Sequence, residues 1–402
     1  MRLTVISHTP HYMRDGTVVG WGPTVREIDY LADLFDSVAH VAPLHSEPAP
    51  DNASPYASPR VELQSVRPSG GDSLFDKLNI PARWPAYCSA IWRACRNSDV
   101  VHVRCPANIS LLAILLLPLM KHHRARWIKY AGNWRPTADD PLSYRFQRWW
   151  LRIGRHRAQV TVNGEWIGEP AHIHFFLNPC LTEVELSDGA AVAKEKRLDF
   201  PVRLLYVGGI EAAKGAGRAV EIIGELNRRG VNATLDLVGD GVDRKALELR
   251  LTDLGIRDRA TFHGWIPRRE IPNYYRDSHI ILLPSDSEGW PKVLSEAMAY
   301  GVVPLASEVG SIPQILRQCQ SGSAFPKDDI RRFANAVQDY IRNPARWLEE
   351  STNGLQAAPM FGYDEYLVRV RALLQLGERD FPRTLASVGM DSAPDSAAKG
   401  GP

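Results

Sequence analysis

The chain lacks several patterns that mark common protein classes. It has only five cysteines, an odd number without CxxC spacing, which disfavours a disulfide framework and is typical of reduced thiols in a cytosolic protein. The longest apolar run, Ile109 to Met120, has 12 residues, whereas a membrane-spanning helix needs about 20. The amino terminus lacks the long apolar core and cleavage site of a signal peptide and is expected to be a first strand. These absences argue against a secreted, disulfide-rich or membrane-spanning protein.

Two further absences concern ligands. Neither half of the chain has a GxGxxG pattern after its first strand, which disfavours an NAD-dependent dehydrogenase. The formal net charge is only +2 and no nucleic-acid-binding motif is present, so we expect no nucleic-acid partner. The rest is ordinary for a globular protein, with 44% apolar and 23% charged residues.

Short runs rich in Val, Ile and Leu alternate with longer amphipathic stretches, which predicts parallel strands covered by helices. The pattern occurs twice, so we expect an α/β fold of two doubly wound domains. Residues 46–60, rich in Pro, Ser and Ala, are expected to form an exposed loop. The strand candidates of the first half are LTVIS, VAHVA, VELQSV, DVVHVRC, RWIKYAG and QVTVNG. Those of the second half are VRLLYVGG, ATLDLVGDG, ATFHGW, HIILLPS and VVPLAS.

Composition changes suggest the domain boundaries. Residues 1–180 are expected to form the first Rossmann-like domain and residues 201–360 the second, joined by a linker at 181–200 that is rich in charged and small residues. Residues 361–377 are expected to form a C-terminal helix. Residues 378–402 have little apolar periodicity and are expected to be disordered.

The stretch EGWPKVLSEAMAYG, Glu288 to Gly301, places two glutamates eight positions apart at the start of a helix. Pro291 suits the first helical position, and Gly301 suits the cap at the other end. Glu288 then lies just outside the helix, and Glu296 lies roughly 7 to 8 Å further along, at 1.5 Å per residue. Because helical side chains lean toward the amino terminus, both carboxylates are expected to reach one crevice at the carboxyl edge of the sheet.

This helix start suggests a ligand that carries both a phosphate and hydroxyl groups. Unpaired N–H groups and the helix dipole favour an anion there, while the carboxylates accept hydrogen bonds from hydroxyl groups. A nucleotide sugar offers both, with a ribose at one end and a hexose at the other. The alternative is a capping carboxylate on a solvated helix face, and the spacing alone does not decide between the two.

The stretch SDSEGWPKVLSEAMAYGVVPLASEVGSIPQIL closely resembles the E-x7-E region of the retaining glycosyltransferases of family 4. Upstream, LLYVGGIEAAKGAGRAVEIIGEL followed by LDLVGDG resembles the start of that family's donor domain. The similarity spans most of Val202 to Leu316 and is weaker in the first half. It implies the GT-B fold, in which two Rossmann-like domains with parallel sheets face each other across a cleft. The second domain would bind the donor and the first the acceptor, and the helix at 361–377 would cross back to the first domain.

The resemblance also implies roles for individual residues of the donor domain. Glu296 would bind the ribose hydroxyls of the donor, and Glu288 the hydroxyls of the transferred sugar. Lys214 would balance the diphosphate, where an ammonium stabilises the charge that grows on the leaving group. The backbone N–H groups at the helix start would face the diphosphate or the sugar, namely those of Gly289, Trp290 and Lys292.

The chain departs from the family pattern beside the lysine. An arginine is usual five residues before it, whereas this chain has Gly208 and Gly209 there. One of the two expected cations of the donor site is therefore missing. Lys292, Arg218 and Arg244 are candidates to replace it.

In the first domain, Gly20 and Gly22 match a glycine loop that lets the backbone approach the diphosphate, although a plain turn would also explain them. Arg104, at the carboxyl end of a buried strand, is expected to pair with an anion or a carboxylate. Many relatives have a histidine after the strand RWIKYAG, where this chain has Ala131, and Asn133 is the nearest polar substitute.

A basic segment extends over residues 121–157, with ten Lys and Arg against two acids. Its helix candidate, PLSYRFQRWWLRIGRHR, mixes arginines with aromatic residues, which suits the surface of an anionic membrane. The alternative is a helix that buries its aromatic side chains against its own sheet. His8 and His11, just after the first strand, are candidates to line the acceptor side.

We therefore expect a retaining, hexosyl-type glycosyltransferase that transfers a sugar from a nucleoside-diphosphate donor to a hydroxyl of a saccharide or lipid-linked saccharide, in bacterial polysaccharide or glycolipid biosynthesis. No D-x-D triplet is present, so we expect neither a metal nor another cofactor. The expected location is the cytoplasm, with peripheral contact to the inner face of the membrane. The alternatives are an epimerase-like GT-B enzyme and a catalytically silent sugar-nucleotide-binding protein.

Overall fold

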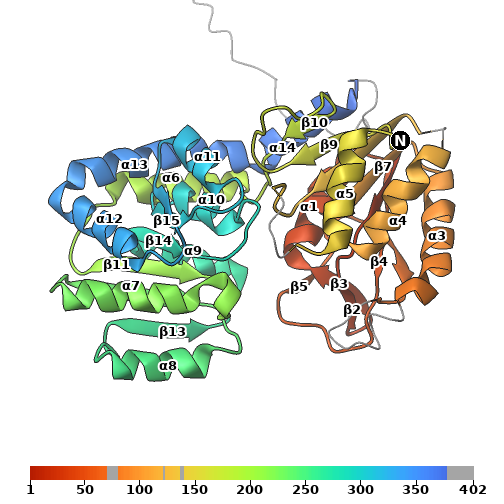
Figure 1. The fold of residues 1–402 in the computed structure, drawn as a ribbon. Helices are drawn as coiled ribbons and strands as arrows, with labels where there is room; N and C mark the ends of the chain where they lie inside the picture. The colour runs from red at the N-terminus through yellow and green to blue at the C-terminus, as the bar shows by residue number, and fades with distance from the viewer. Residues whose placement is uncertain (70–79, 121–122, 136–139, 378–402) are drawn as a thin grey trace, which may run out of the picture.

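The computed structural model describes residues 1–69, 80–120, 123–135 and 140–377. Figure 1 shows two α/β halves side by side, the first in red to yellow and the second in green to blue. Each half is built on one parallel sheet, so the predicted doubling of the fold is confirmed. The expected tail at 378–402 lies outside the described residues.

The first half holds a seven-stranded sheet of order β10-β9-β8-β7-β1-β4-β6, in which every neighbouring pair is parallel. All six strand candidates form strands here. Five of them are largely buried, as expected for inner strands of a parallel sheet, whereas VELQSV forms an edge strand without a buried residue. The strands are β1 (Arg2–Ile6), β4 (Ser37–Pro43), β6 (Val61–Val66), β7 (Val100–Cys105), β8 (Ala125–Tyr130), β9 (Gln159–Val162) and β10 (Ile173–Phe175). The helices are α1 (Gly22–Ala32), α3 (Ile80–Arg96), α4 (Asn108–Leu116) with the 3₁₀ turn Leu117–Leu119, and α5 (Leu142–Ile153).

A small antiparallel sheet in this half was not predicted. It joins β2 (His11–Arg14), β3 (Thr17–Trp21) and β5 (Ala53–Pro55). The turn between β2 and β3 is Asp15–Gly16, with φ of +51° and +77°, which is the geometry of a tight hairpin turn. The strand β5 lies inside the segment 46–60, which was expected to be only a loop.

The second half holds a six-stranded parallel sheet of order β13-β12-β11-β14-β15-β16. Its strands are β11 (Val202–Val207), β12 (Ala233–Val238), β13 (Ala260–Gly264), β14 (Ile280–Leu283), β15 (Val303–Ser307) and β16 (Ser323–Phe325). Its helices are α7 (Ala216–Arg228), α8 (Arg244–Asp253), α9 (Ile271–Asp277), α10 (Lys292–Ala299), α11 (Ile312–Cys319), α12 (Ile330–Arg342) and α13 (Pro344–Ala357). Three 3₁₀ turns accompany them, η2 (Ala212–Lys214), η3 (Arg268–Glu270) and η4 (Ala358–Phe361).

Both sheets reverse their strand order beside their first strand. In the second half the reversal lies between β11 and β14, and in the first half between β1 and β7. Loops that leave the two strands at such a point diverge to opposite faces and open a crevice at the carboxyl edge, where ligands of these folds bind. The candidate site is therefore expected at the loops after these four strands.

The segment 181–200, expected to be a linker, is largely helical. Helix α6 (Glu183–Glu195) begins with a capping box, in which the Thr182 hydroxyl accepts from the N–H of Glu185 and the Glu185 carboxylate accepts from the N–H of Thr182. The helix packs on the second half, where Gly189 lies so close to the backbone of Ala299 that a Cβ would come within 2.4 Å of its carbonyl oxygen. The small residues that suggested a linker are the residues that let this helix pack tightly.

Helix α14 (Tyr363–Leu374) follows the second half in the chain but packs on the first. Tyr366, Val370 and Leu374 belong to a hydrophobic core with residues of β1, α1 and β8, and the ring of Tyr363 stacks on Tyr30 of α1 at 3.9 Å. The chain thus passes between the halves twice, at residues 176–182 and at 361–363. A bridge between Leu181 and Gly362 holds these two crossings together.

Candidate active site

The two residues with predicted catalytic roles meet at the crevice of the second half. Lys214 ends η2, between β11 and α7, and Glu288 lies in the loop between β14 and α10. The Nζ of Lys214 donates a hydrogen bond to Oε1 of Glu288 at 2.9 Å. Their side chains are 46% and 17% exposed, so both are accessible to a ligand. A diphosphate that reaches Lys214 would therefore also lie beside Glu288.

A glycine allows this approach of the two loops. Gly215, directly after Lys214, has φ +83°, and a Cβ there would lie 2.1 Å from the carbonyl oxygen of Pro284. Tyr206 holds the loop before Gly215 in place. Its hydroxyl donates to the carbonyl oxygens of Gly209 and Lys214 at 2.8 and 3.2 Å. The position of the lysine thus depends on packing against the end of β14.

The second glutamate of the motif is held differently from the first. Glu296 is buried in α10, and its Oε2 accepts from the hydroxyl of Tyr275 at 2.9 Å. Its Oε1 accepts from Arg268, which also donates to Oε1 of Glu185 at 2.9 Å and to the carbonyl oxygen of Cys180 at 2.7 Å. Both oxygens of Glu296 are therefore engaged by the chain's own groups, and a ribose would have to share or displace them. Its role in donor binding stays a prediction.

The start of α10 differs in detail from the prediction. The helix begins at Lys292, and Pro291 is its N-cap rather than its first residue. The Trp290 side chain is buried, stacks on Phe361 at 5.4 Å and donates from Nε1 to Oγ of Ser295 at 2.8 Å. Because that side chain belongs to the core of the second half, only the Trp290 backbone remains to serve a ligand.

Gly289 joins the two halves at the mouth of the crevice. A Cβ at this position would lie 2.7 Å from the carbonyl oxygen of Ala131 and 2.6 Å from Nδ2 of Asn163, both in the first half. Nearby, Gln314 of α11 exchanges two hydrogen bonds with the backbone of Glu165, at 2.9 and 2.5 Å. The crevice of the second half is thus covered on one side by the segments of the first half that contain Ala131 and Glu165.

A buried charge cluster lies where α1, β7, β8 and α14 meet, and we call it the Glu27 cluster. The side chain of Glu27 is 1% exposed and accepts from Arg104 at 2.8 and 3.2 Å, from Lys129 at 2.6 Å and from the hydroxyl of Tyr366 at 2.8 Å. Although burial acts to raise the pKa of Glu27, Arg104 and Lys129 hold it well below its usual value. Arg104, predicted as a ligand contact, thus has a carboxylate partner in its own domain.

Lys292 faces this cluster from the second half. Burial lowers its pKa, while the charge of Glu27 acts to raise it. Within the described part of the chain its ammonium makes no hydrogen bond or ion pair. Burial likewise lowers the pKa of Lys129 to about 7, against the opposing charge of Glu27. The charges of Arg104, Lys129 and Lys292 therefore all act on Glu27, the first two through direct contacts.

The other candidates for the missing arginine are already paired. Arg218 contacts Asp286 and Asp328, each at 2.7 Å, and donates to the carbonyl oxygen of Pro284 at 3.0 Å. Arg244 pairs with Asp240 and Glu248 at 3.3 and 3.1 Å. No cation stands at Gly208 or Gly209. Of the three residues considered, Lys292 alone has no hydrogen bond or ion pair with another described residue.

The remaining predicted residues lie in the first half. Gly20 lies in β3 and Gly22 begins α1, so they form a strand end and a helix start rather than a free glycine loop. A Cβ on Gly20 would come within 2.6 Å of the ring of His11, which is buried and hydrogen-bonded to Tyr56 at 2.8 Å. The buried His11 side chain therefore packs between Gly20 and Tyr56 and lines none of the pockets described here. Asn133 accepts at Oδ1 from the backbone N–H of Arg135 at 3.1 Å.

A pocket of about 330 Å³ opens at the carboxyl edge of the first sheet, next to the reversal of strand order. It is lined by residues that follow β1, β4, β6 and β7 and by the starts of α4 and α5, including His8, His45, Pro106, Asn108 and Tyr144. His8 thus lies where the sequence predicted an acceptor side. Burial lowers its pKa, and the nearby charge of Arg104 acts in the same direction.

Sequence reasoning missed three charged residues of the region. Glu27 and Lys129 lie on a helix and a strand that also carry other charged residues, so nothing in the sequence singled them out as a buried pair. Arg268 follows β13 in IPRRE, and nothing in that stretch indicated a contact with Glu296. Among the described residues, no group of three or more His, Cys, Asp or Glu side chains could hold a metal ion. No described helix is long and apolar enough to cross a membrane.

Comparisons with known proteins show what the second half resembles. Residues 192–355 match the family model "Glycosyl transferases group 1". The amylovoran biosynthesis glycosyltransferase AmsK of Erwinia amylovora is 32% identical over 143 residues, 34% of this chain and 35% of that protein. The chain thus spans less than half the length of the curated relatives that it matches.

Solved structures match over the whole described fold. Sucrose-phosphate synthase of Thermosynechococcus elongatus superposes with a TM-score of 0.69 at 20% identity, covering 93% of this chain and 98% of that one. HepE of Anabaena, solved in complex with UDP and glucose, gives 0.65 at 15% identity, covering 93% and 99%. The chain has the GT-B fold, and its residues 192–355 are similar to the group 1 glycosyl transferases.

Proposed function

We propose that the protein is a retaining glycosyltransferase that moves a sugar from a nucleoside-diphosphate donor to a hydroxyl acceptor, as the family 4 resemblance implies. The observation that carries the proposal is the Lys214–Glu288 pair at the reversal of strand order, directly before the start of α10. This places one ammonium for a diphosphate and one carboxylate for sugar hydroxyls at the same helix start. The complex of HepE with UDP and glucose supports such a donor.

The proposed step breaks the bond between the anomeric carbon and the diphosphate oxygen, and forms a bond from the acceptor oxygen to that carbon. The proton of the acceptor hydroxyl leaves with the departing diphosphate. Lys214 offsets the growing charge on that diphosphate, where a fixed cation is most effective. Lys292 supplies the second cation in place of the missing arginine, since it is without a partner and lies at the first residue of α10. The donor needs no metal in this scheme.

The acceptor is assigned to the pocket near His8, because that pocket opens at the carboxyl edge of the first sheet. Helix α5, whose Tyr144 lines this pocket, exposes an apolar stripe at helical spacing. Its Trp149 is 53% exposed, and Leu142 is 79% exposed. With the exposed Arg145 and Arg155 beside it, this stripe suits an anionic membrane that carries a lipid-linked saccharide.

A thermal-shift panel of UDP, GDP, ADP and TDP sugars tests the donor, because a ligand that binds the native state raises the melting temperature. We expect a shift with one nucleotide and its loss in Glu296→Ala. Glu270→Ala, an exposed carboxylate on the neighbouring turn, is the matched control and should retain the shift. An unchanged shift in Glu296→Ala would remove Glu296 from the donor site.

A second candidate function is a sugar-nucleotide-binding protein without transferase activity. Two observations favour it, namely the glycines in place of the usual arginine and the engagement of both Glu296 oxygens by Arg268 and Tyr275. Incubation with the identified donor and a panel of acceptors separates the two. Donor binding without transfer or hydrolysis would favour the silent protein, and product formation would exclude it.

A further inference from the structure

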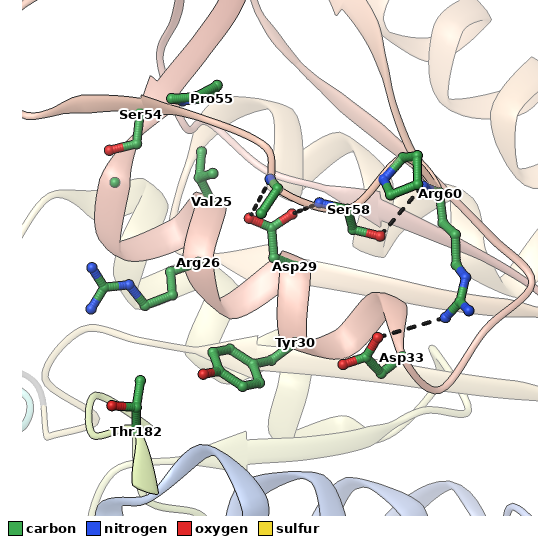
Figure 2. A pocket seen from close by; sticks show the side chains of 13 residues that line it. Val25, Arg26, Asp29, Tyr30, Asp33, Ser54, Pro55, Ser58, Arg60 and Thr182 are labelled. Carbon is green, nitrogen blue, oxygen red and sulfur yellow. Dashed lines mark hydrogen bonds and ion pairs between the residues drawn. The ribbon is translucent and has the colours of Figure 1, made fainter. Parts of the chain in front are cut away.

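A second pocket of about 610 Å³ extends along α1 of the first half, and we call it the α1 pocket (Figure 2). Its walls are one face of α1 and the segment 54–60, and Thr182 closes one end. A volume of this size is usual for a small-molecule site. The lining side chains labelled in the figure are Val25, Arg26, Asp29, Tyr30, Asp33, Ser54, Pro55, Ser58, Arg60 and Thr182.

The α1 pocket is long and starts beside the cleft between the halves. Its lining extends from Gly22, the first residue of α1, to Asp33 after the helix, which is roughly 16 Å at 1.5 Å per residue. Arg26 lies 3.9 Å from Glu185, which pairs in turn with Arg268 beside Glu296. An extended ligand in this pocket would therefore have one end near the cleft and the other on the outer surface of the first half.

The charges of the lining balance, with two arginines and two aspartates. Asp29 accepts from the backbone N–H groups of Ala57 and Ser58 at 3.0 and 3.1 Å, and Asp33 lies 3.6 Å from Arg60. Each carboxylate has acceptor sites beyond these contacts. The guanidinium of Arg26 makes no hydrogen bond within the described residues. The lining thus offers both donors and acceptors without a net charge.

This chemistry fits sugar hydroxyls, which both donate and accept. The exposed Pro55 and Pro59 add apolar surface against which the CH faces of a sugar ring pack. A phosphate would gain little here, because the two carboxylates offset the attraction of the two arginines. A peptide that adds a strand is also disfavoured, because prolines 55 and 59 lack an N–H and the N–H groups of Ala57 and Ser58 are taken by Asp29.

We propose that the α1 pocket binds a neutral saccharide chain. The binding itself does not depend on the proposed transferase function. Its interpretation as a site for the distal part of the acceptor does rest on that function, because the pocket begins beside the cleft and leads away from it. The alternative occupant of the α1 pocket is a free glycan that is not a substrate, because it offers the same hydroxyl groups.

Saturation-transfer NMR on the full chain tests the binding, with maltohexaose, isomaltohexaose, cellohexaose and mannohexaose as probes, and inorganic phosphate and the peptide Gly-Ser-Gly-Ser-Gly-Ser for comparison. We expect at least one hexasaccharide to bind and the other two probes not to bind. Ala57→Trp fills the pocket but keeps the backbone N–H that Asp29 accepts, so it should weaken saccharide binding at least tenfold. Ala246→Trp, at an exposed alanine of α8, is the matched control and should leave binding unchanged.

The proposal is overturned if no hexasaccharide binds, if only phosphate or the peptide binds, or if Ala57→Trp binds as tightly as the parent. The thermal shift by the donor should be equal in Ala57→Trp and in the parent, so failure of this site is distinguishable from failure of the donor site. A raised KM for a long acceptor with an unchanged KM for a monosaccharide acceptor would identify the distal acceptor as the source. Equal KM values for both acceptors would identify a free glycan.

Discussion

The Glu27 cluster leads to a sharp prediction about stability. Glu27→Gln keeps the volume of the side chain but removes the one negative charge that Arg104 and Lys129 share. Breaking a buried ion pair from one side costs about 3–5 kcal/mol, because it leaves the partner charge uncompensated. Lys129 can lose its proton, since its pKa is already about 7, whereas a guanidinium cannot. We therefore expect the lower end, about 3 kcal/mol of unfolding free energy.

Hydrogen exchange measured by mass spectrometry is the suitable assay, because a chain of two halves need not unfold in one step. Peptides from β7 and β8 should exchange roughly 100-fold faster in the variant, since each 1.4 kcal/mol is a factor of ten. Peptides from the sheet of the second half should change much less. The change should be confined to the half that contains the cluster.

Glu365→Gln is the matched control, because it removes a carboxylate from the same helix as Tyr366. Its partner Arg369 lies at 2.8 Å, but the two side chains are 43% and 33% exposed. Such a pair contributes less than about 1 kcal/mol. If Glu27→Gln cost no more than Glu365→Gln, the cluster would be screened by solvent and the reasoning about buried charge would be refuted.

Two further predictions concern pH and the contact between the halves. Unfolded Lys129 keeps its proton up to about pH 10.4, whereas the folded side chain loses it near pH 7, so stability should rise with pH between these values. In Lys129→Met this rise should be smaller in pH-dependent urea unfolding, while an exposed Lys245→Met should retain it. Gly289→Ala should separate the halves and raise the radius of gyration in small-angle scattering, because its Cβ would clash with Ala131. Gly217→Ala, whose Cβ meets only Leu247 at 3.5 Å, should leave that radius unchanged.

Most of the fold follows from local pattern. Eleven runs were expected to be strands, and each forms one in the structure. Most of them are buried on both faces of a parallel sheet, which demands an almost continuous apolar sequence, whereas β6 and β13 lie at sheet edges and are partly exposed. The strands β2, β3, β5, β10 and β16 were not predicted, because they are short and partly exposed. Helix α6 was not predicted, because its alanine and glycine residues were interpreted as linker composition. The capping box of Thr182 and Glu185 was the signal that a helix begins there.

The candidate site could also be predicted only in part. Lys214 and Glu288 each follow a strand of one sheet, and the strand order of a doubly wound fold brings the ends of such strands together. The partners of Glu296 and Glu27 could not be predicted, because they come from other elements far away in the chain. Arg268 precedes Glu296 by 28 residues, and Tyr366 follows Glu27 by 339 residues. Such contacts depend on packing between elements, which a single sequence does not display.

The most direct test of the account is a calorimetric titration of the donor identified in the thermal-shift panel. The account predicts one site per chain, because a single helix start with Lys214 and Glu288 beside it holds the diphosphate. Lys214→Ala should weaken the affinity at least tenfold, since a hydrogen bond to a charged group contributes about 1.5–3 kcal/mol. Equal affinities of the parent and of Lys214→Ala would contradict the central claim that the donor lies across the start of α10.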